Sequence, residues 1–365
     1  MAADRDARLV ARTRALDPLV RGISARFALL SAVTPKNATR EQERVLTAWR
    51  TGRELSPRWE PPELDRRLLA SARRALDEVL VSLREEQGWL AVYRGRFVEL
   101  AKDLAVIDTA FSPAMTDAAA ARFGDADDAR SDADQIAAAF DEGRRDLDDD
   151  TLIATDDPNE PGSLLSRMRA RLSELRLPVR VLVRERVGSL AAAGDGVVIV
   201  AANKTATRRE TERVVVHEIE GHVLPRERGR TGRFGIETLG SAGASEDEEG
   251  RALLLEERTG LLGERRRRSL AARHRAARLV EAGATFVDVV RRTRESVSLE
   301  EALAIGSRVM RGGWARGADV LGGLARERVY LAALARVRAA IAQDPDLFER
   351  LGSRRVSLDA SRLLR

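Results

Sequence analysis

The chain of 365 residues contains no cysteine, which excludes disulfide bonds, thiolate metal ligands and cysteine nucleophiles. It also lacks any long hydrophobic run, because charged residues interrupt each apolar stretch well before the roughly 20 residues that span a membrane. The first ten residues carry four charges and no apolar core, unlike a secretory signal. We therefore expect a cytoplasmic protein with no membrane partner.

Lysine is almost absent, and this explains an isoelectric point of about 10.2 that would otherwise suggest a nucleic-acid partner. The net charge is only +5, from 63 basic and 58 acidic residues, and the lysines are Lys36, Lys102 and Lys204. Arginine keeps its proton beyond about pH 12, so a small arginine excess raises the isoelectric point strongly. Polyanion binding through the basic runs 265–268 and 273–275 is a weaker alternative, because we expect these residues to form a solvated helix face.

The first 120 residues are predicted to be helical. Apolar residues recur at three- and four-residue spacing over 64–83, the pattern of an amphipathic helix. Residues 124–162 differ, with 14 Asp or Glu against 3 Arg, which is typical of a solvated loop or short polar helix. We expect a boundary there, between an N-terminal, mostly helical region of 1–160 and a second domain of 161–365.

The second part of the chain combines short strands with helices. The sequence predicts a helix over 164–177, followed by strands at 179–183 and 197–200 with a glycine-containing turn before the second strand. Beyond about residue 245 the chain is predicted to be mostly helical. The expected fold class is therefore α+β and mostly helical.

Capping boxes mark three helix starts in this part. Each pairs Ser or Thr with a Glu three residues later: Thr207 with Glu210, Ser245 with Glu248, and Ser298 with Glu301. The helix that Thr207 starts is expected to end by Leu224, because Pro225 follows.

Two of the three histidines, His217 and His222, lie five residues apart on this helix, and Glu218 directly follows the first. Two imidazoles from one helix and a carboxylate from elsewhere form a zinc site that leaves a fourth position for water, and Glu218 stands where a general base would. On a regular helix, five residues leave the two imidazoles about 140° apart. A π-type turn would bring them together, and Gly221 makes such a turn accessible. The alternative is that His217 and His222 are unrelated residues of a regular helix that binds no metal, in which case the helix needs no π-type turn.

An acidic side chain on a later helix is expected as the third ligand. Four candidates lie together at a predicted helix start: Glu246, Asp247, Glu248 and Glu249. Acidic residues are also favoured at a helix N-terminus by the helix dipole alone, so the residues by themselves leave the choice open.

The order of these motifs resembles the microtubule-associated tyrosine carboxypeptidase family, whose bacterial relatives are known as flavohaemoglobin-expression-modulating proteins. The resemblance begins with a strand, Asn203-Lys204, the His-Glu-x-x-x-His helix and a Glu-Glu-Gly helix start. It continues through Arg311-Gly312-Gly313 and 326–331, and it touches 32–38 near the N-terminus. It is clearest over about 165–345.

The resemblance implies a zinc ion held by His217, His222 and Glu249, with Glu218 as the general base and Glu248 mainly as a capping residue. It also implies the core of a glutamate-type zincin, in which a small mixed sheet lies beside the metal-binding helix.

Residues near the family's Phe-Thr-Lys-Asp stretch, which reads Leu-Ala-Arg-Glu here, are further candidates. Tyr330 corresponds to a family tyrosine and is a candidate donor to an oxyanion, and Arg326 and Arg328 are candidates for binding a terminal carboxylate. Arg251 replaces the hydrophobic residue expected after Glu-Gly, so the metal site is better supported than the substrate preference.

We therefore expect a zinc metallocarboxypeptidase that removes a C-terminal residue from a peptide or protein. The alternative is a non-catalytic, zinc-binding regulatory protein, against which the presence of Glu218 argues, because a structural metal site needs no base.

Overall fold

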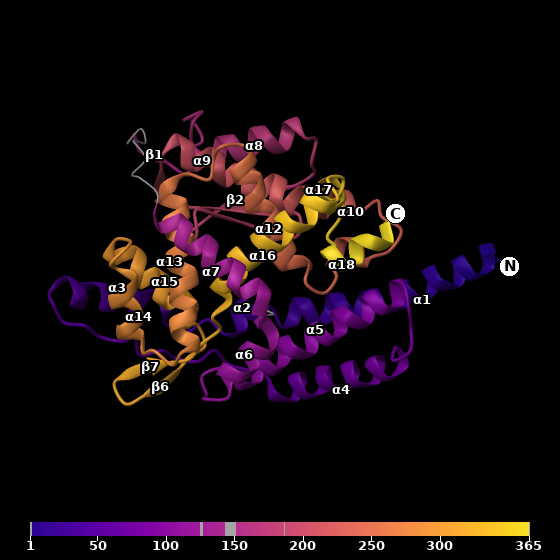
Figure 1. Cartoon of the computed structure of the whole chain (residues 1–365), viewed down its shortest axis with the longest axis horizontal. Helices are drawn as coiled ribbons and strands as arrows, with labels where there is room; N and C mark the ends of the chain where they lie inside the picture. Colours follow the sequence, from indigo (N-terminus) through magenta and orange to yellow (C-terminus); the bar gives the residue numbers. More distant parts are fainter. Residues whose placement is uncertain (1, 125–126, 143–150, 186, 365) are drawn as a thin grey trace. The chain divides into compact units, whose positions relative to one another are not determined.

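The computed structural model describes residues 2–124, 127–142, 151–185 and 187–364 (Figure 1). The chain forms two compact units: unit 1 comprises 1–143 and 267–335, and unit 2 comprises 144–266 and 336–365. The expected domains, 1–160 and 161–365, stay a prediction. Within the acidic run, residues 127–141 form a helix, whereas 125–126 and 143–150 lie outside the described residues. None of the described helices combines the length and low charge needed to cross a lipid bilayer.

Unit 1 is built of helices with one small hairpin. Its elements are α1 (Ala2–Arg26), α2 (Leu29–Ala32), α3 (Ala38–Arg50), α4 (Arg66–Ser82), α5 (Trp89–Thr109), α6 (Met115–Phe123), α7 (Asp127–Asp141), most of α13 (Glu264–Glu281), α14 (Phe286–Thr293), α15 (Leu299–Val309), β6 (Trp314–Arg316), β7 (Asp319–Leu321), the 3-10 turn η2 (Arg326–Arg328) and the start of α16 (Val329–Gln343). Helices α1, α4 and α5 run side by side (Figure 1), and α4 confirms the helix predicted over 64–83.

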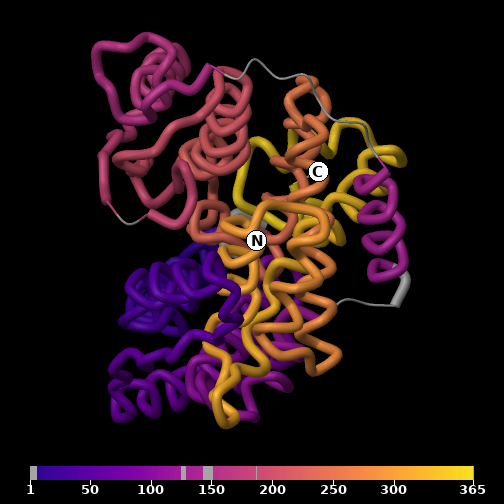
Figure 2. The backbone as a smooth tube through the Cα atoms, turned by 90° about the vertical axis from the view of Figure 1, so that its left-hand side faces the viewer, coloured from indigo at the N-terminus to yellow at the C-terminus, as the bar shows by residue number. Residues whose placement is uncertain are grey.

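The core of unit 1 joins segments that are far apart in the sequence. Alanines on one face of α13, such as Ala272 and Ala276, are fully buried against α14 and α15. Helix α3 packs against α15, and Figure 2 shows the indigo N-terminal helices beside the orange segment of the chain. Small side chains let these helices approach closely, which favours a dense core.

Unit 2 contains a small sheet covered by helices. Its elements are β1 (Ile153–Ala154), α8 (Leu164–Glu174), β2 (Arg180–Arg184), β3 (Ala191–Ala193), β4 (Val197–Ala201), β5 (Thr205–Ala206), α9 (Arg208–Val215), the π-helix η1 (Val216–Val223), α10 (Leu224–Gly229), α11 (Ile236–Leu239), α12 (Ala244–Arg258), the end of α16, α17 (Leu347–Ser353), α18 (Leu358–Ser361) and the 3-10 turn η3 (Arg362–Leu364). The α+β, mostly helical fold class is confirmed.

The sheet has the order β2-β4-β3, with β2 parallel and β3 antiparallel to β4, so it is mixed. Strands β2 and β4 confirm the predicted strands within one residue at each end. Val198 and Val200 of β4 pack with Met168 of α8 and Ile219 of η1 in one apolar cluster. This packing fixes the position of the histidine helix against the sheet.

Several local expectations about helix ends are decided by the structure. Thr207 and Ser298 are N-caps, as expected, and each side chain accepts a hydrogen bond from the backbone three residues on. The box at Ser245 is wrong: the N-cap of α12 is Gly243, two residues earlier, and no side chain caps the helix. Gly243 has a left-handed backbone with φ of 73°, which glycine adopts without strain.

The basic run 273–275 does not form the expected solvated face, whereas in the run 265–268 Arg265 is exposed and the other arginines are half-buried. Arg273 and His274 are buried on α13. Arg273 forms an ion pair with Glu327, and His274 Nε2 lies 2.7 Å from Asp134 Oδ1. Because acidic partners already neutralise these groups, the runs offer less free positive charge than their sequence suggests.

Candidate metal centre

The two histidines lie on a π-helix, which confirms the predicted irregularity. Helix η1 replaces an α-helical course over Val216–Val223. In a π-helix each residue bonds to the residue five positions away, so side chains five apart come onto the same side. The Nε2 atoms of His217 and His222 are 3.3 Å apart, and their rings meet edge to face with centroids 5.0 Å apart.

Gly221 and Arg251 explain how this turn is accommodated. A Cβ atom at Gly221 would lie 2.7 Å from the Cβ of Ala252, so only glycine lets α12 approach so closely. Pro225 has no N–H, which leaves carbonyls of the preceding turn without a backbone donor. The Arg251 guanidinium donates to the Glu220 carbonyl at 2.9 Å and approaches that of Gly221 at 3.5 Å.

Pro225 therefore does not end the helix, contrary to the expectation from sequence. It occupies the first turn of α10, which continues to Gly229. The expected stop at Leu224 fails because a side chain from α12 supplies the donor that proline lacks. The arginine that departs from the family pattern thus has a structural role.

Glu249 brings a carboxylate to the two imidazoles. Its Oε2 atom lies 3.5 Å from His217 Nε2 and 3.7 Å from His222 Nε2. Zinc bonds of about 2.0–2.1 Å in a tetrahedral site place neighbouring donor atoms roughly 3.3 Å apart. The three donor atoms are therefore spaced as a tetrahedral metal site requires, and within the described part of the chain this is the one such group of His, Asp or Glu.

Each imidazole also has a carboxylate on its Nδ1 side, opposite the Nε2 atom that faces Glu249. Glu256, which is fully buried, has Oε1 2.8 Å from His217 Nδ1 and is also approached by Arg213 and Arg266. Carboxylates in this position orient metal-binding histidines and raise their basicity.

Glu248 takes the corresponding place behind His222. Its Oε2 atom lies 3.7 Å from His222 Nδ1, and Arg355 donates to both of its carboxylate oxygens at 2.8 and 3.2 Å. The expected role of Glu248 as a helix cap is therefore wrong, since α12 already begins before it and its side chain is engaged with His222 and Arg355.

Charge pairing outweighs burial throughout this cluster. Burial disfavours a charged imidazole, yet the carboxylates of Glu248 and Glu249 raise the pKa of His222 to about 10. The pKa of His217 is raised in the same way by Glu249 and Glu256. Burial would raise the pKa of Glu248, but Arg355 and His222 lower it to about 2, and both imidazoles hold the pKa of Glu249 well below its usual value. A divalent cation could replace these protons and keep the charges balanced.

Glu218 lies beside the edge of the sheet. Its Oε2 atom accepts a hydrogen bond from the Ala193 N–H at 2.9 Å. Ala193 ends β3, which is an edge strand in the order β2-β4-β3. The half-buried carboxylate is thus oriented by the backbone and is not among the three donors that converge.

The other candidate residues belong to unit 1. Tyr330 is half-buried at the start of α16, with the Arg273 guanidinium carbon 4.2 Å and that of Arg326 5.9 Å from its ring centroid. Arg328 is buried, forms an ion pair with Glu281 and donates to the Ala119 carbonyl at 3.2 Å. Their roles toward a substrate stay predictions.

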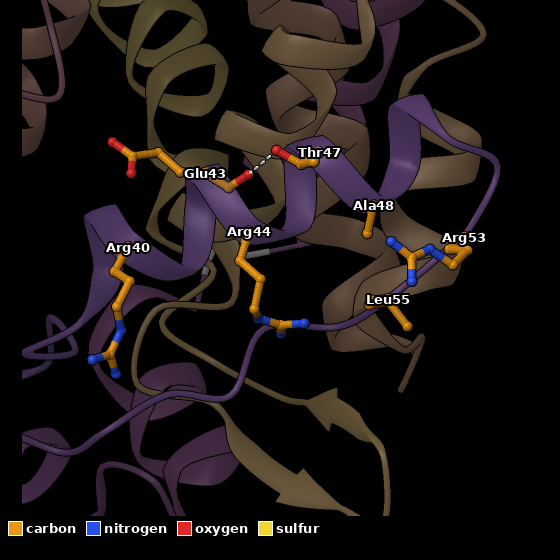
Figure 3. A pocket seen from close by; sticks show the side chains of 7 residues that line it. All are labelled: Arg40, Glu43, Arg44, Thr47, Ala48, Arg53 and Leu55. Atoms are coloured by element: carbon orange, nitrogen blue, oxygen red, sulfur yellow. Dashed lines mark hydrogen bonds between the residues drawn. The ribbon is translucent and has the colours of Figure 1, made fainter.

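A separate cavity of about 440 Å³ runs along α3 in unit 1 (Figure 3). None of the predicted site residues lines it. Arg40 and Arg44 extend from the same side of the helix (Figure 3), and they form ion pairs with Glu60 and Glu41 respectively. We therefore base no function on this cavity.

Sequence reasoning missed the carboxylate behind His217. Glu256 follows Glu249 by seven residues, two turns of the same helix, so helical spacing could have identified it. No comparable signal exists for Arg355, which lies 107 residues from its partner Glu248.

Comparison with known proteins gives one family. The model of the microtubule-associated tyrosine carboxypeptidase family matches residues 53–365. No curated protein matches the chain.

Proposed function

Because the chain belongs to the microtubule-associated tyrosine carboxypeptidase family, we propose that it is a zinc-dependent carboxypeptidase acting on the C-terminus of a peptide or protein in the cytoplasm. The family itself points to a carboxypeptidase, a hydrolase with a peptide or protein substrate. The observation that carries the zinc dependence is the convergence of His217, His222 and Glu249 at tetrahedral donor distances. The small mixed sheet against the π-helix supports a zincin-like core.

His217, His222 and Glu249 would hold the metal. When bound, zinc would act as a Lewis acid toward the peptide carbonyl and make water acidic enough to lose a proton near neutral pH. Glu256 and Glu248 would keep each imidazole oriented with Nε2 toward the metal, as their positions behind the two Nδ1 atoms suggest.

Glu218 would act as the general base. Its carboxylate can take a proton from the attacking water and deliver it to the leaving amine, and the hydrogen bond from Ala193 restricts its orientation. The same strand would hold an extended peptide, because an edge strand offers backbone groups for strand addition.

Three further residues are candidates for contacts with the substrate. Tyr330 remains our candidate for stabilising the oxyanion through its hydroxyl group. Arg326 and Arg328 remain the candidates for binding a substrate carboxylate, and Arg328 already forms an ion pair with Glu281 and donates to the Ala119 carbonyl.

The test starts with elemental analysis of the purified protein, followed by a library of peptides with free C-termini. We expect about one zinc per chain and release of single C-terminal residues, which stops after zinc is removed by a chelator and returns when zinc is added. A protein that binds zinc but hydrolyses no peptide would favour the non-catalytic zinc-binding regulator.

A further inference from the structure

Strand β3, whose last residue donates a hydrogen bond to Glu218, gains little stability from the sheet itself. It contains only Ala191, Ala192 and Ala193, and it pairs with β4 at the edge of the order β2-β4-β3. Three small side chains bury little apolar surface, and so short a hairpin is marginally stable by itself. The position of β3 therefore depends on contacts from outside the sheet.

The register of the hairpin determines which backbone groups of β3 face away from β4. The Ala201 N–H donates to the Leu190 carbonyl at 2.9 Å, so Leu190 faces β4. Since bonded pairs alternate along an antiparallel ladder, the backbone groups of Ala191 and Ala193 point to the open edge. The hydrogen bond from the Ala193 N–H to Glu218 agrees with this direction. The Ala193 carbonyl thus faces the edge to which an extended peptide would add.

Lys204 holds the loop that leads into β3. Its Nζ atom donates to the carbonyls of Val187 and Ser189, at 2.8 and 3.0 Å respectively. The hydroxyl group of Ser189 donates to the Ala191 carbonyl at 2.6 Å, so the loop and the strand are connected. Hydrogen bonds from a charged donor are roughly twice as strong as those between neutral groups. The ammonium group is therefore a strong restraint on this short segment.

The backbone that carries Lys204 is itself fixed. Asn203 has a left-handed φ of 57°, a conformation in which asparagine is enriched, and it forms the bend between β4 and β5. The N–H of Thr155, a buried residue, donates to the Lys204 carbonyl at 2.9 Å. Lys204 is half-buried, so its side chain extends from a fixed backbone toward the loop.

The contacts at the other end of β3 are weaker. Asp195, in the turn that follows the strand, forms ion pairs with Arg230 at 2.9 Å and with Arg226 at 3.9 Å. Asp195 and Arg230 are exposed, and exposed ion pairs contribute little to stability. We expect the contacts of Lys204 to contribute more to the position of β3.

We propose that Lys204 is a positioning residue of the carboxypeptidase site, which holds β3 in place to pair with the backbone of a peptide. It would act through the loop 187–190 and the strand. The role toward a peptide rests on the proposed function, whereas the restraint on the strand does not. The Asn203-Lys204 motif, to which the metal centre assigns no role, would thus supply the bend and the charge that fix the substrate-binding edge.

Hydrogen exchange of the purified protein, followed by mass spectrometry over 187–193, tests the restraint on the strand. Lys204→Met removes the charge, and exchange over this segment should accelerate about tenfold or more, because hydrogen bonds from a charged group are lost. Lys204→Arg can still donate to carbonyls and should restore part of the protection. The matched control is Lys36→Met, the same change at an exposed ion pair with Glu63 in unit 1, and it should exchange as the wild type does.

Peptide affinity tests what this restraint is for. Calorimetry in the zinc-loaded Glu218→Gln background, where turnover does not interfere, uses the library peptide that the wild type cleaves fastest. Lys204→Met should weaken its binding about tenfold, because the strand is no longer held in its binding position. Its zinc content should stay unchanged, and Lys204→Arg should recover part of the affinity.

Unchanged exchange over 187–193 in Lys204→Met would overturn the inference, as would faster exchange with unchanged peptide affinity. Ser189→Ala breaks the same connection at an exposed residue and decides the question if Lys204→Met does not fold: it too should accelerate exchange, to a smaller extent. If the wild type cleaves no peptide of the library, the proposed function fails and the role toward a peptide falls with it. Hydrogen exchange still decides, in that case, whether Lys204 holds β3.

Discussion

In unit 2 each imidazole of the η1 cluster has a carboxylate at its Nδ1 side and shares a third at its Nε2 side, whereas in unit 1 the carboxylate of Glu327 interacts electrostatically with four guanidinium groups, those of Arg273, Arg308, Arg311 and Arg326. Both clusters are partly or fully buried. The first pairs carboxylates with groups that can lose a proton, and the second pairs a carboxylate with guanidinium groups that cannot.

The difference determines which cluster can accept a cation. Raised pKa values favour protons on His217 and His222, and a divalent cation can displace protons without leaving a carboxylate unpaired. Around Arg311 the positive charges are permanent, because arginine does not lose its proton in proteins, so a cation cannot replace them. The predictions below alter this contrast by a single substitution or by pH.

Removal of an imidazole should have the largest effect. His217→Ala and His222→Ala should each lose zinc at micromolar free metal and all peptide hydrolysis, because the two remaining protein ligands are too few to hold the ion. Glu249→Gln should keep part of its zinc with weakened affinity, since a neutral amide is a poorer ligand. Elemental analysis of the dialysed proteins measures this.

The control comes from the other unit. His274→Gln, which removes the imidazole paired with Asp134, should retain zinc. Loss of metal in that variant alone would show that the ligand assignment is wrong.

Substitution of the base should separate chemistry from metal binding. Glu218→Gln should keep the zinc and the fold, because Glu218 is not among the converging donors and glutamine is nearly isosteric. Its kcat should still fall about 10²–10⁴-fold, since an amide cannot transfer the proton. Steady-state kinetics on a peptide substrate provide the measurement.

Glu220→Gln is the matched control for this change. Glu220 lies two residues away on η1, and its carboxylate binds Arg171 instead of facing the histidines. It should leave kcat nearly unchanged. Full activity in Glu218→Gln would show that Glu218 is not the general base.

The sequence was sufficient to predict the π-type turn. Five-residue spacing cannot place His217 and His222 together on a regular helix, and Gly221 between them permits the departure. The strands β2 and β4 and the cap at Thr207 were also predictable, because their signals are contained within a few consecutive residues.

Features that depend on distant partners were not predictable from one sequence. Pro225 carries a local stop signal, but Arg251 on another helix supplies the missing donor. Glu248 carries a local capping signal, but Arg355 and His222 determine its actual position. In both cases a tertiary contact outweighs the local preference, and sequence spacing contains no information about it.

The carboxylate behind His217 should matter less than the ligands themselves. Glu256→Gln should lower zinc affinity about 10–100-fold, the usual loss when such a partner is removed, while some activity remains at saturating zinc. Competition with a chromophoric chelator measures the affinity. The matched control is Glu257→Gln. The carboxylate of Glu257 forms an ion pair with Arg338, so this variant should bind zinc as the wild type does. Equal affinities for the two variants would remove Glu256 from the metal centre.

The smallest change is one of pH alone, and it tests the idea that zinc displaces protons. The metal-free protein should hold protons on both imidazoles at pH 7, because the carboxylates raise the pKa of His222 to about 10 and also raise that of His217. Protons bound below these pKa values compete with zinc, so zinc affinity should rise with pH, by up to about tenfold per pH unit for each proton displaced.

The direction of this change follows from the raised pKa of the histidines. At its ordinary pKa of about 6.5 a histidine would already be neutral at pH 7 to 8, and zinc affinity would be nearly constant there. Calorimetry between pH 7 and 8 in buffers of different ionisation enthalpy counts the protons released. A zinc affinity that does not change over this range, with no proton release, would show that the carboxylates around η1 do not hold the imidazoles protonated, and the contrast with the arginine cluster would then lose its electrostatic basis.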